Sequence, residues 1–145
     1  MINKYYVIGL PVCHSLSPII HTRLYELYGI SNCTYSARDI APDNLGEFLC
    51  HIPEENIFGF NVTMPLKQEI LSFLDHTDAS AADGANTVVV RHGKLFGYST
   101  DAPGFFQSLH DRGIQCAGKN IVFLGCGSVA KTLIRNMIPQ KPTRI

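Results

Sequence analysis

Asn61, Thr63 and Lys67 place an amide, a hydroxyl and an ammonium group within one short stretch of the chain. The residues from Ile57 to Met64 are rich in apolar and β-branched types, which predicts a short buried strand. Pro65 ends this strand because proline donates no amide hydrogen bond, and it suits the first turn of a helix, so Lys67 falls where the helix dipole disfavours a cation. The stretch therefore predicts a compact polar binding site beside an apolar wall. Read alone, it is explained equally well by a strand, a turn and a solvated lysine.

Two serines come before another predicted helix. Ser17 followed by Pro18 is typical of a helix start, because the hydroxyl caps free amides and proline takes the first helical position. Capping alone accounts for Ser17. Ser15 adds a second hydroxyl beside the same free amides, and this combination favours a site for a carboxylate or a phosphate.

The surrounding pattern predicts strands that alternate with helices. Strands are expected at 5–9, 34–40 and 57–64, and helices at 17–28, 42–51 and 65–74. In the first helix, apolar spacing predicts one buried face made of Ile20, Leu24, Leu27 and Tyr28. Such alternation argues for an α/β fold with a mainly parallel sheet and helices on both faces.

A tight hairpin is predicted next, with strands at 86–91 and 94–100 joined by His92-Gly93. Asn86 begins its first strand, and Asp101 directly follows its second. A helix is expected after Pro103, and it would bridge to a second unit.

The second unit carries a glycine-rich loop. The apolar run 120–124 predicts a strand, and the G-x-G-x-x-A string at 125–130 follows it and precedes a predicted helix. In that context the glycines allow the pyrophosphate of a dinucleotide to approach the helix amides. The alternative is a glycine turn that only packs a helix on a strand. One strand and one helix bury too little surface to order themselves, so the chain is expected to be the front part of a longer protein or to borrow packing from another chain.

Composition limits the function classes. A formal net charge of zero and a pI near 7.0 provide no basic face for nucleic acid or for an anionic membrane. No apolar run approaches the roughly 20 residues of a membrane helix. The five cysteines form no C-x-x-C pair and the six histidines show no metal-ligand spacing, so no metal is expected. The start of the chain has no signal-peptide pattern, and a cytoplasmic location is expected.

Five segments together resemble the shikimate dehydrogenase family, in its order and near its spacings: 9–18, 61–67, 86–87, 99–101 and 125–130. The resemblance implies two α/β domains with a cleft between them, where an NADP-dependent enzyme reduces 3-dehydroshikimate to shikimate. It divides this chain into a substrate-binding domain at 1–102 and, at 103–145, a linker helix with the truncated start of a Rossmann dinucleotide-binding domain. Ser99 departs from the family pattern, which usually has asparagine there.

The resemblance also implies a role for each matched residue. The substrate carboxylate would be held by Ser15 and Ser17, and the ring hydroxyls by Asn61, Thr63, Asn86 and Asp101. Lys67 and Asp101 would form the catalytic pair, because hydride reduction of a ketone leaves an oxyanion that an ammonium group can stabilise and protonate. NADP would be bound through Gly125, Gly127, Ser128 and Ala130.

Other functions are also consistent with these residues. A quinate or quinate/shikimate dehydrogenase would act on a closely related ring acid. The 145-residue chain could instead be a non-catalytic module that binds such an acid but no nucleotide, and a purely structural α/β domain is a third alternative. The residue that selects NADP over NAD usually follows a second Rossmann strand, beyond the residues present. Nothing in the sequence fixes the oligomeric state, so a homodimer stays open.

Overall fold

A computed structural model describes residues 2–145; residue 1, the first of the predicted domain 1–102, lies outside them. The strands are β1 (Asn3–Gly9), β2 (Cys33–Asp39), β3 (Ile57–Val62), β4 (His76–Thr77), β5 (Thr87–Arg91) and β6 (Lys94–Tyr98). The α-helices are α1 (Ser17–Leu27), α2 (Leu45–Cys50), α3 (Ile52–Glu55), α4 (Leu66–Glu69), α5 (Asp101–His110) and α6 (Ser128–Met137). Short 3₁₀ turns occupy Pro42–Asn44, Ile70–Phe73, Ala79–Ala81 and Ile138–Gln140.

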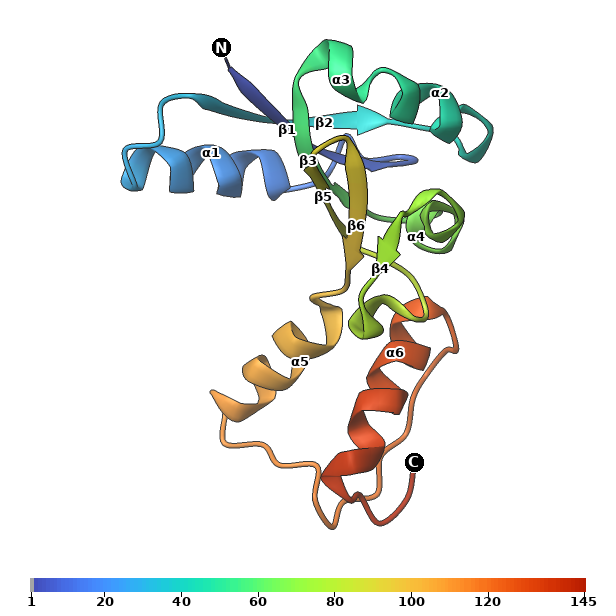
Figure 1. The fold of residues 1–145 in the computed structure, drawn as a ribbon. Coiled ribbons are helices and arrows are strands. Elements are labelled where there is room, and N and C mark those ends of the chain that lie inside the picture. Colours follow the sequence, from blue (N-terminus) through green and yellow to red (C-terminus); the bar gives the residue numbers. More distant parts are fainter. Residues whose placement is uncertain (1) are drawn as a thin grey trace.

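The six strands form one sheet in the order β2-β1-β3-β5-β6-β4 (Figure 1). β1 pairs in parallel with β2 and β3, whereas β5 runs antiparallel to both β3 and β6. The prediction of an α/β fold is confirmed, and the sheet is mixed: β4 also pairs in parallel with β6, so β5 alone runs against the other strands. The reason is the tight turn at His92 and Gly93, whose positive φ values of 51° and 73° reverse the chain without the crossover that a parallel pair needs.

The core lies on one face of the sheet. Successive side chains of a strand point to opposite faces, so Tyr6 and Ile8 of β1 pack toward α2 while Tyr5 faces α1. Figure 1 places α1 on the other side of the sheet from α2 and α3. The largest fully buried core side chains on the α2 side include Ile8, Leu45, Leu66 and Ile70.

α1 contradicts its predicted packing, because none of its residues is buried. Leu27 and Tyr28, expected to point inward, are 65% and 77% exposed. The helix contacts the sheet through rings instead: His21 stacks on Tyr35 of β2, and Tyr25 lies against Tyr5 of β1. The prediction that the apolar residues of α1 form a buried face is therefore wrong.

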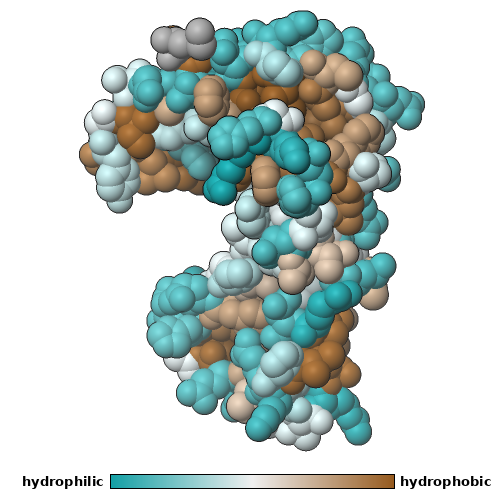
Figure 2. All heavy atoms as spheres, in the orientation of Figure 1, coloured by the Kyte–Doolittle hydropathy of each residue, from teal (hydrophilic) through white to brown (hydrophobic). Residues whose placement is uncertain are grey.

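The residues after β6 form a second body. α5 and α6 pack against each other, and Figure 2 shows the molecule hollowed between this body and the part that carries the sheet. The strand predicted at 120–124 is not formed: only one parallel bridge joins Asn120 to Arg144, and Val122 and Leu124 are 82% and 98% exposed. A single extended segment without a neighbouring strand cannot bury its apolar side chains. The predicted start of a Rossmann domain is thus present only as a loop and a helix.

Candidate functional site

Four chain segments meet at one edge of the sheet. β1 and β3 are parallel, so the segments that follow Gly9 and Val62 leave at the same edge. β5 runs the opposite way and begins there, just after Asn86, and β6 reverses again to end just before Asp101. The sheet topology therefore gathers residues from four distant parts of the sequence.

A cavity of about 450 Å³ lies at this edge. Six of the residues predicted to bind substrate line it, namely Ser15, Ser17, Asn61, Thr63, Lys67 and Asn86. Apolar walls come from Val7, Leu10, Pro11, Val12, Val62 and Met64. The combination of apolar walls with a few convergent polar groups is typical of a small-molecule site.

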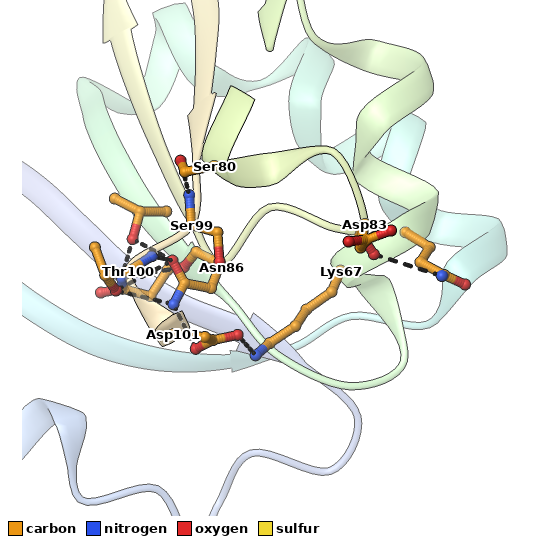
Figure 3. Close-up of polar contacts among 10 residues, drawn as sticks. Lys67, Ser80, Asp83, Asn86, Ser99, Thr100 and Asp101 are labelled. Atoms are coloured by element: carbon orange, nitrogen blue, oxygen red, sulfur yellow. Dashed lines mark hydrogen bonds and ion pairs between the residues drawn. The ribbon is translucent and has the colours of Figure 1, made fainter. Parts of the chain in front are cut away.

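Asp101 completes the set through direct contacts. Its Oδ2 accepts a hydrogen bond from Lys67 Nζ at 2.7 Å, and its Oδ1 accepts one from Asn86 Nδ2 at 2.7 Å (Figure 3). The lysine and aspartate side chains are only 14% and 23% exposed, so the ion pair is screened less than a surface pair. A largely buried ammonium held by a carboxylate can donate a proton and stabilise negative charge on a bound oxygen.

Close backbone approaches hold Lys67 in this position. The amide of Ala85 donates to the Lys67 carbonyl oxygen at 2.9 Å. Gly84, with φ of 144°, packs so closely that a Cβ there would lie 3.0 Å from that same oxygen. Glycine is required at this contact because other residues avoid such a backbone conformation.

The two serines differ from expectation in their helix-capping roles. α1 begins at Ser17 with Leu16 as its N-cap, and no side chain caps it. The backbone amide of Ser17 instead donates to Ser15 Oγ at 3.3 Å. The hydroxyl of Ser17 is therefore not the capping group that the sequence suggested, and both serines face the cavity.

Sequence reasoning missed several neighbours of the site. His21 lines the cavity one turn after Ser17, a spacing that could have revealed it. Thr87 Oγ donates to Asn86 Oδ1 at 2.8 Å, and the Thr100 amide donates to the same oxygen at 3.0 Å. Tyr35 reaches the site from β2 and had no local signal, since its proximity depends on strand register.

The two aromatic neighbours have shifted ionisation. Burial raises the pKa of Tyr35 to about 12, against a smaller lowering by the neighbouring Ser17 side chain. Burial also lowers the pKa of His21 below its usual value, because the charged imidazolium loses hydration. The structure therefore favours the neutral form of both rings.

The predicted cofactor residues lie outside this cavity. Gly125, Gly127, Ser128 and Ala130 form the loop and first turn of α6. Gly125 has φ of 111°, a conformation suited to glycine, and no atom outside the chain neighbours lies within 4 Å of where a Cβ would stand on Gly125 or Gly127. The loop and the free amides of α6 fit a pyrophosphate, although the supporting strand is not formed.

Residues 2–145 contain neither a metal-binding cluster nor a membrane-spanning helix. This part of the chain holds no group of three or more His, Cys, Asp or Glu residues placed to bind a metal ion. None of its helices combines the length and apolar character needed to cross a membrane.

A sheet edge that carries an apolar-walled polar cavity and a lysine–aspartate pair defines a small-molecule-binding α/β domain. Residues 7–88 match the family described as the shikimate dehydrogenase substrate binding domain. This match spans more than half of the chain, and the chain belongs to that family.

Similar proteins agree with this assignment. The NADP(+) shikimate dehydrogenase of Nitrosopumilus maritimus is 38% identical over 141 residues, which cover 96% of this chain and 51% of that protein. The crystal structure of shikimate dehydrogenase from Aquifex aeolicus superimposes with a TM-score of 0.92 at 34% identity, over 99% of this chain and 54% of that one. The crystal structure of shikimate 5-dehydrogenase from Thermus thermophilus, in complex with NADP(H) and shikimate, superimposes with a TM-score of 0.89 at 33% identity. The match covers 99% of this chain and 54% of that one. The chain spans about half the length of these proteins.

Proposed function

We propose that this chain is the substrate-binding part of an NADP-dependent shikimate dehydrogenase, which interconverts 3-dehydroshikimate and shikimate. The observation that carries the proposal is the Lys67–Asp101 ion pair at 2.7 Å beside a cavity that contains both Ser15 and Ser17. A ring acid with several hydroxyls needs one anion site and several hydrogen-bonding groups, and the cavity offers both.

The polar groups share three tasks in the proposed reaction: they bind the carboxylate, bind the ring hydroxyls and transfer the proton. Ser15 and Ser17 donate their hydroxyl hydrogens to the substrate carboxylate, and Asn61, Thr63, Asn86 and Asp101 bind ring hydroxyls. Lys67 Nζ donates a proton to the ketone oxygen as negative charge develops there, and Asp101 holds that ammonium in place through its hydrogen bond. In the reverse direction the same nitrogen accepts the proton.

The hydride comes from NADPH when the cofactor is bound, and Gly125, Gly127, Ser128 and Ala130 are the residues proposed to hold its pyrophosphate. The proposed division is a substrate domain at 1–102 and a linker helix with the opening of a cofactor domain at 103–145. Because Val122 and Leu124 lie almost fully in solvent, the supporting strand is not packed. We therefore expect the 145-residue chain alone to bind the ring acid and to have no dehydrogenase activity.

Titration calorimetry of this chain with shikimate tests the function. Shikimate is expected to bind, and the double variant Ser15→Ala/Ser17→Ala is expected to bind it about 10- to 100-fold more weakly, since hydrogen bonds to a charged group are lost. The methyl ester of shikimate is the matched control: it has no carboxylate charge, so its weaker binding should change much less in the same variant. Equal losses for acid and ester would contradict the serine assignment.

Two further measurements separate the alternatives. Quinate binding tighter than shikimate binding would favour a quinate dehydrogenase, and no binding of either acid would remove the proposal. Shikimate-dependent reduction of NADP⁺ by the chain alone would contradict its expected lack of activity.

A further inference from the structure

The side-chain amide of Asn61 is bonded on both of its ends. Its Oδ1 accepts a hydrogen bond from the Tyr35 hydroxyl at 2.6 Å. Its Nδ2 donates to the carbonyl oxygen of Asn86 and to Thr87 Oγ, each at 3.2 Å. An amide has two donor hydrogens and two acceptor lone pairs, so a single lone pair on Oδ1 is left for a ligand.

The direction of the Tyr35 bond decides which way this amide faces. A phenol keeps its hydrogen at neutral pH and can both donate and accept, and burial, which raises the pKa of Tyr35 to about 12, favours this protonated form further. The phenol oxygen lies 2.6 Å from Asn61 Oδ1, which accepts that hydrogen. With the amide rotated by a half turn, the nitrogen would meet the phenol and the oxygen would meet the carbonyl of Asn86, an acceptor facing an acceptor.

The ring of Tyr35 is itself held from the helix side. It is 7% exposed, and the imidazole of His21 stacks on it with ring centres 4.0 Å apart and planes 5° from parallel. His21 belongs to α1, whose first residue Ser17 also lines the cavity. The start of α1 and the amide of Asn61 are thereby connected through one phenol.

We propose that Tyr35, clamped by His21, is a positioning residue that fixes the amide of Asn61 so that its oxygen accepts from a hydroxyl of the bound ring acid. The identity of that ligand rests on the proposed function. The orientation of the Asn61 amide also affects its neighbours. Thr87 Oγ, which accepts from Asn61, donates to Asn86, and Asn86 donates to Asp101, the partner of Lys67. Tyr35 thus stands at the far end of a hydrogen-bonded chain that ends on the proposed catalytic pair.

Nuclear magnetic resonance of the ¹⁵N-labelled chain tests the proposal. The two Nδ2 hydrogens of Asn61 are identified by the loss of their signals in Asn61→Asp. In Tyr35→Phe we expect both signals to shift and the two hydrogens to exchange with water faster. The reason is that Asn61 Oδ1 loses the hydrogen bond it accepts from the Tyr35 hydroxyl, so the amide is no longer held in one orientation. Shikimate binding should weaken by about tenfold, the change expected for one lost hydrogen bond.

Tyr6→Phe is the matched control, since Tyr6 lies on the opposite face of the sheet against Phe48 and should leave the Asn61 signals unchanged. His21→Ala keeps the phenol but removes the stacked ring, so it should quicken Asn61 exchange even if Tyr35→Phe fails to fold. Unchanged Asn61 signals in the folded variants would overturn the proposal. The Asn61 signals are read without ligand. A chain that binds neither shikimate nor quinate would therefore contradict the proposed function, while the Asn61 signals would still decide whether Tyr35 positions the amide.

Discussion

Ser99 lies two residues before Asp101 of the proposed catalytic pair, and its buried hydroxyl has no hydrogen-bond partner in the described residues. Only 4% of the residue is exposed, and its Oγ is unpaired in the part of the chain that the structure describes. Its backbone amide is satisfied, since it donates to Ser80 Oγ at 3.0 Å. A buried hydroxyl without a partner costs free energy that its removal recovers.

We predict that Ser99→Ala raises the free energy of unfolding by about 1 kcal/mol, because the desolvation penalty of the orphan hydroxyl disappears. Ser80→Ala is the same chemical change with the opposite expected sign: it removes the acceptor of the Ser99 amide and should cost about 1 to 2 kcal/mol. Urea unfolding followed by circular dichroism measures both. A loss of stability in Ser99→Ala would mean that its hydroxyl has a partner, such as an ordered water.

His21 supports a prediction about pH. Burial lowers its pKa in the folded state, so the unfolded chain binds a proton more readily. The stabilising contribution is complete above the unfolded pKa of about 6.5 and is lost as pH falls below it toward the folded value. We expect the free energy of unfolding to fall more in the wild type than in His21→Phe between about pH 7.5 and about pH 5.5. The phenylalanine keeps a ring against Tyr35 but cannot titrate, and equal slopes would refute the prediction.

The candidate site was more predictable than its supports. Residue type and position at a strand end pointed to Lys67, the family resemblance added Asp101, and the structure places the two side chains in contact. Tyr35 and His21 could not be found this way, because their meeting depends on how α1 crosses β2. That geometry is set by tertiary packing and leaves no local trace in the sequence.

Among the elements, the end of β1 is packed against the segment that follows β3. The amide of Leu10 donates to the Met64 carbonyl oxygen at 2.9 Å, and the amide of Thr63 donates to that of Ile8 at 2.9 Å. A Cβ on Gly9 would lie 2.5 Å from Thr63 Cγ2 and 2.6 Å from the Met64 oxygen. The cavity wall that carries Thr63 therefore depends on glycine at the end of β1.

We predict that Gly9→Ala lowers the free energy of unfolding by about 1 to 3 kcal/mol, because the added methyl forces the two segments apart. Shikimate binding should weaken with it, since Thr63 moves. Gly104→Ala provides the comparison: no atom beyond its own helix lies within 4 Å of that Cβ, and alanine in α5 should add up to about 1 kcal/mol. Thermal unfolding and calorimetry measure the two effects, and a neutral Gly9→Ala would show that the close approach is relieved at little cost.

Local signals predicted the elements unevenly. The turn residues His92 and Gly93 correctly predicted the β5–β6 hairpin, because their backbone conformation is itself the signal. The two-residue strand β4 was not predictable, since it pairs with β6 only through tertiary placement. In α1, the apolar spacing predicted a buried face that the structure leaves in solvent, because periodicity identifies a face but not what covers it.

Across the whole molecule, apolar burial is concentrated on one side of one sheet. The core cluster joins β1, β3 and β5 to α2, α3 and α4, while the run at 120–124 has no comparable cover. The glycine loop was correctly placed before α6, but the strand before it needs neighbours that the described residues do not supply. The pattern of a strand can thus be read from sequence while its formation depends on partners.

The same substitution at two leucines measures this contrast. Leu45 of α2 is fully buried and Leu124 is 98% exposed. Leu45→Ala should lower the free energy of unfolding by about 2 to 5 kcal/mol, through lost transfer energy and a cavity, whereas Leu124→Ala should change it by less than about 0.5 kcal/mol. The chain has no tryptophan, so far-ultraviolet circular dichroism in urea is the suitable probe. A loss of several kcal/mol at Leu124 would mean that the segment is packed in solution as the strand its sequence predicted, and the supported glycine loop would then be competent to hold a dinucleotide.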